Sequence, residues 1–204
     1  EKHTFIPGNT NVYNKDYSSY SLEDVCLEMS SLGKGDIREP FIEVTYPNGS
    51  STTDMVFDRA EIIQGKEEYD TLPGSYDDNG EVEQLVIYLK DRNYNLTLEL
   101  HYYVYEKCDI ITRSAKLVNS GNESVRLERL MSMQLDLNES DYELSFFNGA
   151  WAREMNRSRI PIRAGKYVNE SVTGTSSNRA NPFFMIGRSS TTEDYGECYG
   201  FNLI

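Results

Sequence analysis

The chain contains 204 residues, with 20 basic and 33 acidic side chains and a net charge of −13. This acidic composition excludes the basic surface that binding to duplex nucleic acid or anionic lipid requires, so we expect neither nucleic acid nor a membrane as a partner. Aromatic residues make up 12% of the chain, which excludes a disordered protein. The length suits one large β domain or two small ones, and because no linker is visible we expect a single domain over residues 1–204.

The first part of the chain has the composition of loops. Residues 1–31 are rich in asparagine, serine and tyrosine and contain at most one helical turn, near Ser21. Residues 33–36 are predicted to form a glycine-rich turn, which Pro40 ends. The chain does not begin with methionine, so we expect it to be a piece of a longer protein.

An alternation of apolar and polar residues dominates the middle of the chain. It predicts strands over residues 41–46, 55–63, 82–89, 96–104, 111–117 and 125–137, with a loop over residues 67–80. His101 falls on the polar face of its strand and is interpreted as a surface side chain. Consecutive strands without intervening helices predict an all-β fold, a large antiparallel β-sandwich in which two large sheets pack face to face.

The regularity weakens after residue 140. The pattern predicts a strand over residues 142–147, followed by an irregular stretch over residues 148–163 that holds the only tryptophan, Trp151, and four arginines. A last strand is expected over residues 196–204. The sequence stops there without a turn, which indicates that the native chain continues.

No recognisable catalytic, metal or cofactor motif occurs in the sequence. Nucleophile-elbow, phosphate-loop, zinc-protease and dinucleotide-binding patterns are all absent. The two histidines, His3 and His101, lie far in sequence from each other and from the three cysteines, which excludes the usual zinc-site spacing and favours reduced thiols. We therefore expect this chain to contain no catalytic residue, no metal site and no cofactor.

Two short stretches are candidate contact sites, each with two interpretations. Asp36 and Arg38 lie in a glycine-rich turn, where they can form an interface loop or a local salt bridge that fixes the turn. Trp151 beside Arg153 can stack on a sugar ring or form a cation–π pair, although a lone tryptophan in a sandwich is more often part of the core. Because its surroundings are irregular and basic, we expect Trp151 to be partly exposed at a junction with another domain or subunit.

Five motifs, taken together and in order, resemble those of the amino-terminal domain of glycoside hydrolase family 36 α-galactosidases. They are Gly33-Lys34-Gly35-Asp36-Ile37-Arg38-Glu39-Pro40, Asp109-Ile110-Ile111-Thr112-Arg113-Ser114, Asn119-Ser120-Gly121, Gly149-Ala150-Trp151-Ala152-Arg153-Glu154, and Thr173-Gly174-Thr175-Ser176-Ser177 followed by Asn181-Pro182-Phe183. Thr173 and Asn178 depart from the family pattern, which has arginine and histidine at these positions.

The resemblance implies an amino-terminal β-supersandwich, followed in the whole enzyme by a catalytic (β/α)8 barrel and a small carboxy-terminal β domain. It implies retaining hydrolysis of terminal α-galactosides of the melibiose and raffinose type, by two carboxyl groups about 5 Å apart on the barrel. It also implies a bacterial cytoplasmic homo-oligomer. The domain itself would serve subunit assembly and the shaping of a substrate pocket, through candidate contacts at Asp36, Arg38, Trp151, Arg153 and Asn181.

An alternative remains beside this interpretation: a stand-alone carbohydrate-binding or interaction module with a β-sandwich fold. The unfinished apolar strand at residues 199–204 favours the enzyme domain, because a free module would be expected to end on a turn or a cap.

Overall fold

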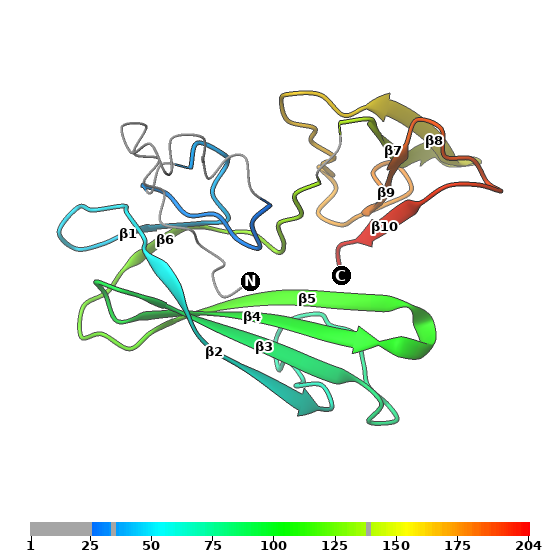
Figure 1. The fold of residues 1–204 in the computed structure, drawn as a ribbon. Helices are drawn as coiled ribbons and strands as arrows, with labels where there is room; N and C mark the ends of the chain where they lie inside the picture. The colour runs from blue at the N-terminus through cyan, green and yellow to red at the C-terminus, as the bar shows by residue number, and fades with distance from the viewer. Residues whose placement is uncertain (1–25, 34–35, 138–139) are drawn as a thin grey trace, which may run out of the picture. The chain divides into compact units, whose positions relative to one another are not determined.

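The computed structural model describes residues 26–33, 36–137 and 140–204 (Figure 1). The chain divides into two compact units, unit 1 over Glu1–Asp136 and unit 2 over Leu137–Ile204, and each is described by itself. The helical turn predicted near Ser21 lies outside the described residues. That residues 1–204 behave as a single domain stays a prediction.

Unit 1 is built on a four-stranded antiparallel sheet with the order β2-β3-β4-β5. Its strands are β2 (Met55–Gln64), β3 (Glu83–Asp91), β4 (Leu96–Tyr105) and β5 (Ile110–Asn119) (Figure 1). The β3–β4 and β4–β5 connections are short, and a 3-10 turn over Glu106–Cys108 forms part of the second; β2 and β3 are joined by a longer segment over residues 65–82. The period-two pattern therefore predicted this sheet correctly.

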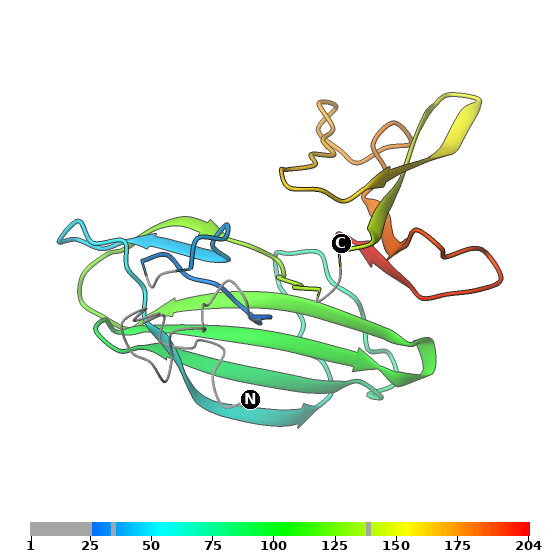
Figure 2. The same cartoon turned by 45° about the horizontal axis from the view of Figure 1, so that its top comes forward.

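A two-stranded antiparallel sheet, β1 (Ile42–Thr45) and β6 (Arg126–Leu130), forms the second layer of unit 1 (Figure 2). The predicted strand over residues 125–137 is thus wrong in length. The last hydrogen bond of this ladder runs from the Met131 amide to the Phe41 carbonyl, at 3.0 Å. The next residue along the partner strand is Pro40, which has no amide hydrogen to donate, so the ladder ends there.

The core of unit 1 lies between these two layers. Fully buried apolar side chains come from both, and they are Met29, Phe41, Ile42, Val44 and Tyr46 on one side and Met55, Leu89, Leu96, Leu98 and Leu100 on the other. The all-β, antiparallel sandwich prediction is therefore confirmed for this unit. Its second layer is a two-stranded sheet instead of the large sheet that was expected.

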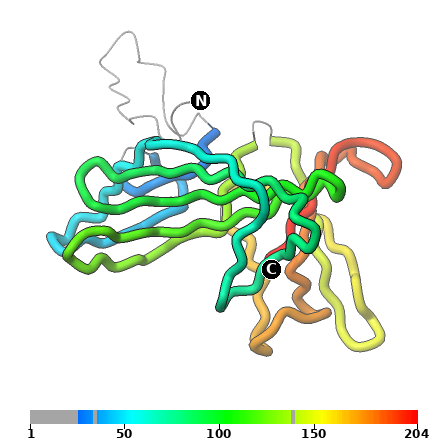
Figure 3. The backbone as a smooth tube through the Cα atoms, turned by 90° about the horizontal axis from the view of Figure 1, so that it is seen from below, coloured from blue at the N-terminus to red at the C-terminus, as the bar shows by residue number. Residues whose placement is uncertain are grey.

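Unit 2 is a four-stranded antiparallel sheet with the order β10-β9-β7-β8. Its strands are β7 (Tyr142–Ala150), β8 (Arg153–Pro161), β9 (Phe183–Arg188) and β10 (Cys198–Asn202) (Figure 1). Figure 3 traces the backbone of this unit from yellow to red. The expectation of an irregular stretch over residues 148–163 is wrong, because β8 pairs with β7 as a hairpin. The final strand is also shorter than predicted.

Aromatic pairs fill the middle of the unit 2 sheet, with ring centroids 5.9 Å apart for Phe147 and Phe183 and 4.9 Å apart for Phe184 and Phe201. Most side chains of β7 and β9 are nevertheless only half-buried. Within the part of the chain that the structure describes, no helix is long and apolar enough to span a membrane.

Candidate functional site

Asp36 and Arg38 form the local ion pair that one interpretation of the sequence predicted. The Asp36 carboxylate accepts hydrogen bonds from the Arg38 backbone amide at 3.0 Å, from Nε at 2.9 Å and from Nη2 at 3.0 Å. Asp36 is only 8% exposed, so its carboxylate is committed to holding the turn. The Arg38 guanidinium keeps more contact with solvent than its partner does.

A second carboxylate joins this pair from a distant part of the sequence. The Arg38 Nη1 atom lies 2.5 Å from Asp136 Oδ2, which also accepts the Leu27 backbone amide at 2.9 Å. Partial burial lowers the pKa of Arg38, but the hydrogen bond that it donates to Asp36 and the charges of Asp136 and Asp36 raise it overall. The turn is thus tied to the chain that leaves β6, a link that sequence spacing does not reveal.

Ile37, between the two charged residues, is the side chain that sequence reasoning missed. It is 81% exposed, whereas Asp36 beside it is buried. The charged neighbours of Ile37 fix the turn, so this apolar side chain is held in the solvent. In that position it is available for contact with another surface. The signal in the sequence is one β-branched apolar residue between two charges in a glycine-rich turn.

Trp151 lies at the tip of the β7–β8 hairpin and is 89% exposed. The interpretation of Trp151 as a core residue is therefore wrong, and the prediction of an exposed tryptophan is confirmed. Ala152 and Met155 adopt left-handed backbone angles, with φ of 60° and 56°, which turn the chain sharply on both sides of Arg153. The Arg153 side chain is exposed, and within the described residues no cation–π contact joins it to Trp151.

Two hydrogen bonds hold this hairpin tip in its shape. The Glu154 carboxylate accepts the Ala152 amide at 2.8 Å, and the Asn156 side chain donates to the Arg153 carbonyl at 2.7 Å. A Cβ atom on Gly149 would lie 2.4 Å from the Arg153 carbonyl oxygen. Only glycine fits at this position, because the backbone itself occupies the space.

Asn181, the third candidate of unit 2, is joined to the same hairpin. Its backbone amide donates to the Phe147 carbonyl at 3.2 Å, and its side-chain oxygen accepts a hydrogen bond from the Phe183 backbone amide at 2.9 Å. Its Nδ2 atom lies 3.8 Å from the Met155 sulfur. Asn181 thus shapes the entry to β9 and fixes it against the hairpin, and a contact with another domain or with substrate stays a prediction.

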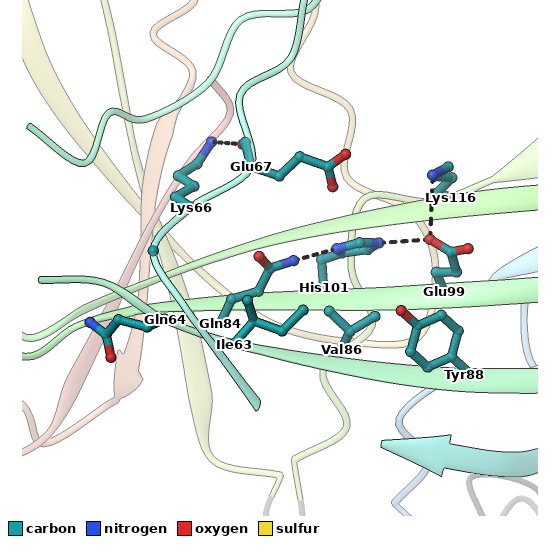
Figure 4. Close-up of a pocket in the computed structure, with 11 residues that line it drawn as sticks. Ile63, Gln64, Lys66, Glu67, Gln84, Val86, Tyr88, Glu99, His101 and Lys116 are labelled. Carbon is teal, nitrogen blue, oxygen red and sulfur yellow. Dashed lines mark hydrogen bonds and ion pairs between the residues drawn. The ribbon is translucent and has the colours of Figure 1, made fainter. Parts of the chain in front are cut away.

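His101 corrects the sequence interpretation, since it is buried at 5% exposure instead of lying on the surface. Its Nδ1 atom lies 2.8 Å from Gln84 Nε2, and its Nε2 atom lies 3.2 Å from a Glu99 carboxylate oxygen (Figure 4). Tyr103, two residues on along the same face, is also buried.

The reason for this burial is that the segment after β2 folds back across the polar face of the sheet. The Tyr69 hydroxyl of this segment lies 2.7 Å from the Tyr103 hydroxyl and 2.6 Å from Ser114 Oγ. The polar face of a sheet is solvated only where no other segment of the chain covers it. Loop composition at residues 67–80 did not reveal where the loop lies.

No group of three metal-binding side chains occurs among the residues that the structure describes. Cys26, Cys108 and Cys198 are exposed there and form no disulfide with one another. The two predicted pairs, Asp36 with Arg38 and Trp151 with Arg153, lie in unit 1 and unit 2 respectively.

Comparison with known proteins identifies the family of the chain. The sequence pattern of the glycosyl hydrolase family 36 N-terminal domain matches residues 1–204. The chain therefore belongs to this family, as the resemblance of its five motifs predicted.

Among curated relatives, the α-galactosidase AgaA of Geobacillus stearothermophilus is 36% identical over 187 residues, which cover 91% of this chain and 26% of the relative. The solved α-galactosidase from Lactobacillus brevis is 37% identical and superposes with a TM-score of 0.84, covering 93% of this chain and 26% of that one. A variant of AgaA solved with raffinose is 36% identical with a TM-score of 0.83, covering 96% of this chain and 28% of its own. The chain thus spans about a quarter of the length of these relatives.

Proposed function

We propose that this chain is the non-catalytic N-terminal domain of an α-galactosidase that hydrolyses terminal α-galactosides of the melibiose and raffinose type with retention of configuration. The observation that carries the proposal is the match of the whole chain to a family domain that makes up about a quarter of its relatives. A raffinose complex of one relative supports the substrate class. The two catalytic carboxyl groups belong to the barrel that the family resemblance implies.

The open sheet of unit 2 supports a role in assembly. Its aromatic and aliphatic side chains on β7 and β9 are half-buried, and Ser145 is the only buried residue in the described part of this unit. A sheet with an apolar face gains stability when a second layer covers that face. The occupant we propose is the remainder of the same enzyme, which in relatives of this chain is about three times as long as the domain itself.

The exposed side chains of the two clusters complete this assignment. Ile37 in unit 1 and Trp151 and Arg153 in unit 2 are exposed, and with the half-buried Arg38 they supply the contacts with the barrel or with a neighbouring subunit of a homo-oligomer. Tryptophan and arginine are enriched among the residues that contribute most to interface binding, and an exposed aliphatic side chain gains free energy when it is removed from water. A bacterial cytoplasmic location accompanies the proposal, and the alternative of a stand-alone binding module is disfavoured by the family match.

Hydrolysis by the full-length gene product tests the proposal. We expect the full-length protein to cleave nitrophenyl α-galactoside and raffinose, with α-galactose as the first product seen by NMR. We expect the 204-residue chain, purified in parallel, to cleave neither substrate. A full-length protein that leaves α-galactosides intact, or an isolated chain that turns them over, would overturn the proposal.

A further inference from the structure

A shallow pocket of about 500 Å³ opens on the covered face of the unit 1 sheet, beside the segment that follows β2 (Figure 4). This volume lies within the range of about 300–1,000 Å³ that small-molecule sites occupy. None of the five family motifs contributes a residue to its lining. The pocket is therefore separate from the clusters around Asp36 and Trp151 that the proposed function uses.

The floor of the pocket combines apolar and polar side chains of neighbouring strands. Val86 of β3 lies directly opposite His101 of β4, and Gln84 lies two residues before Val86 on the same face of β3 (Figure 4). Ile63 of β2 pairs with Gln84 and adds a second aliphatic side chain. A ligand here would meet an aliphatic strip beside a row of hydrogen-bonding groups.

Gln84 has an acceptor that the protein leaves unused. The residue is buried at 3% exposure, and its Nε2 atom is committed to His101 at 2.8 Å. Its Oε1 atom has no hydrogen-bond partner within the described residues, yet it is not among the atoms enclosed away from solvent. An amide oxygen that solvent reaches, on a side chain otherwise held in place, can accept a hydrogen bond from a ligand.

The charges around the pocket cancel. Lys66 lies beside Glu67 and donates to its backbone carbonyl at 3.1 Å. Lys116 lies beside Glu99, which is 3.5 Å from the Lys116 ammonium and 3.2 Å from His101. An ion of either sign would gain little net attraction from such a set. A neutral molecule with several hydroxyl groups, each able to donate and to accept, can use the ammonium donors and carboxylate acceptors together.

We propose that this pocket binds a neutral saccharide unit, with Gln84 Oε1 accepting from one hydroxyl group at the floor and Lys66 and Glu67 contacting others at the rim. Binding is weak, in the millimolar range, because the one aromatic ring of the lining, Tyr88, already carries the Arg59 guanidinium 3.6 Å from its centroid. That contact reduces the ring area on which a sugar can stack. The site needs no catalysis, so it stands independently of the proposed enzyme activity.

NMR titration of the ¹⁵N-labelled 204-residue chain tests this inference, with galactose and raffinose as neutral probes and sodium galacturonate as the charged probe. We expect the neutral sugars to shift the signals of Gln84, His101 and Lys116 saturably at concentrations up to about 100 mM. Galacturonate should bind no more tightly than galactose.

Two variants and a matched control locate the site. Gln84→Met removes the floor acceptor, and Glu67→Ala removes a rim acceptor; each should weaken binding by a factor of about five. Glu68→Ala deletes the same charge from the adjacent residue, which does not line the pocket, and should leave binding unchanged. If Gln84→Met unfolds, the comparison of Glu67→Ala with Glu68→Ala still decides. Absence of saturable shifts, tighter binding of galacturonate, or equal effects of these two glutamate variants would overturn the proposal.

Discussion

Arg113 and Ser114 are neighbours on β5, and their side chains hold two different segments of unit 1 on opposite faces of one sheet. Arg113 donates to the Gln134 carbonyl at 3.0 Å and pairs with Glu28 on the core side. Ser114 Oγ lies 2.6 Å from the Tyr69 hydroxyl on the other side. Successive residues of a strand point to opposite faces, so two adjacent positions can organise both layers.

The contact on the core side extends to the Asp36 turn. The Gln134 side-chain amide lies 3.1 Å from Asp136 Oδ2, the same oxygen that pairs with Arg38. Arg113 thus supports, through the backbone of Gln134, the segment that carries Asp136. The Asp109–Ser114 and Gly33–Pro40 motifs are about seventy residues apart in the sequence, but in the fold a short chain of contacts through Gln134 and Asp136 connects them.

Replacement of Arg113 by methionine should therefore destabilise unit 1. The guanidinium is largely buried, contacts the Tyr102 ring at 4.7 Å and makes hydrogen bonds to a carboxylate and a carbonyl. We expect a loss of about 2 kcal/mol in the free energy of unfolding, measured by urea denaturation. Arg126→Met removes a solvent-exposed ion pair with Glu128 and is the control, with an expected change below about 0.5 kcal/mol. Equal losses in the two variants would contradict this role of Arg113.

Gly149→Ala should disrupt the β7–β8 hairpin. The added methyl group would lie 2.4 Å from the Arg153 carbonyl oxygen and 3.1 Å from that of Asn178, and neither backbone atom can rotate away. We expect a loss of about 3 kcal/mol in unfolding free energy, read from the fluorescence of Trp151, which lies in this hairpin. Gly74→Ala serves as the control, because its methyl group meets only side-chain atoms at 3.4 Å or more. A stable Gly149→Ala hairpin would show that the backbone can move apart at this point.

These residues also illustrate what the sequence could and could not predict. The strands from β2 to β5 were predictable because one face is continuously apolar, and burial follows directly from that alternation. The end of β6 was missed because it depends on Pro40, which is about ninety residues away and becomes its neighbour only by strand pairing. Local periodicity carries no information about which partner strand lacks a donor.

The candidate sites divide in the same way. The Asp36–Arg38 pair was predictable because both groups lie within two residues of each other, so chain geometry alone brings them together. Asp136 and the burial of His101 were not predictable, because each depends on a distant segment that folds across it. Ile37 was overlooked because its exposure depends on the way that the two charged neighbours turn inward.

Trp151 offers a direct test of the assembly role. In the isolated chain its ring is in water, so we expect emission at the long wavelength of a solvated indole and efficient quenching by acrylamide. In the full-length protein, burial against the barrel or a neighbouring subunit should shift the emission to shorter wavelength and protect it from quenching. Subtracting the spectrum of a Trp151→Phe variant isolates the Trp151 signal from that of any other tryptophan in the full-length protein. An unchanged Trp151 signal in the assembled enzyme would argue that this hairpin tip contacts nothing.

The Asp36 turn permits a sharper test, because its buried and exposed side chains have different expected roles. Asp36 is enclosed and holds the turn, whereas Ile37 points outward and makes no polar contact with the rest of the described chain. Loss of the Asp36 carboxylate removes charge-assisted hydrogen bonds from a largely buried group, and Asp36→Ala should cost about 2 kcal/mol in the stability of unit 1. Ile37→Ser changes only an exposed side chain and should leave the stability of the isolated chain within about 0.5 kcal/mol.

In the full-length protein we expect Ile37→Ser to weaken association more than Asp36→Ala does, which is the reverse of their expected order of effect on stability. If Ile37 is buried against another domain or subunit, Ile37→Ser forfeits an apolar contact of about 1–3 kcal/mol per interface. Sedimentation velocity should then detect dissociation of the oligomer, or galactoside kinetics should show a raised KM, at a concentration where the wild-type protein is intact. The double variant Asp36→Ala with Arg38→Ala should produce both defects together, because the turn that presents Ile37 is lost. An Ile37→Ser protein with the wild-type oligomer and the wild-type kinetics would mean that the turn is purely structural, and that the ion pair exists to stabilise unit 1 alone.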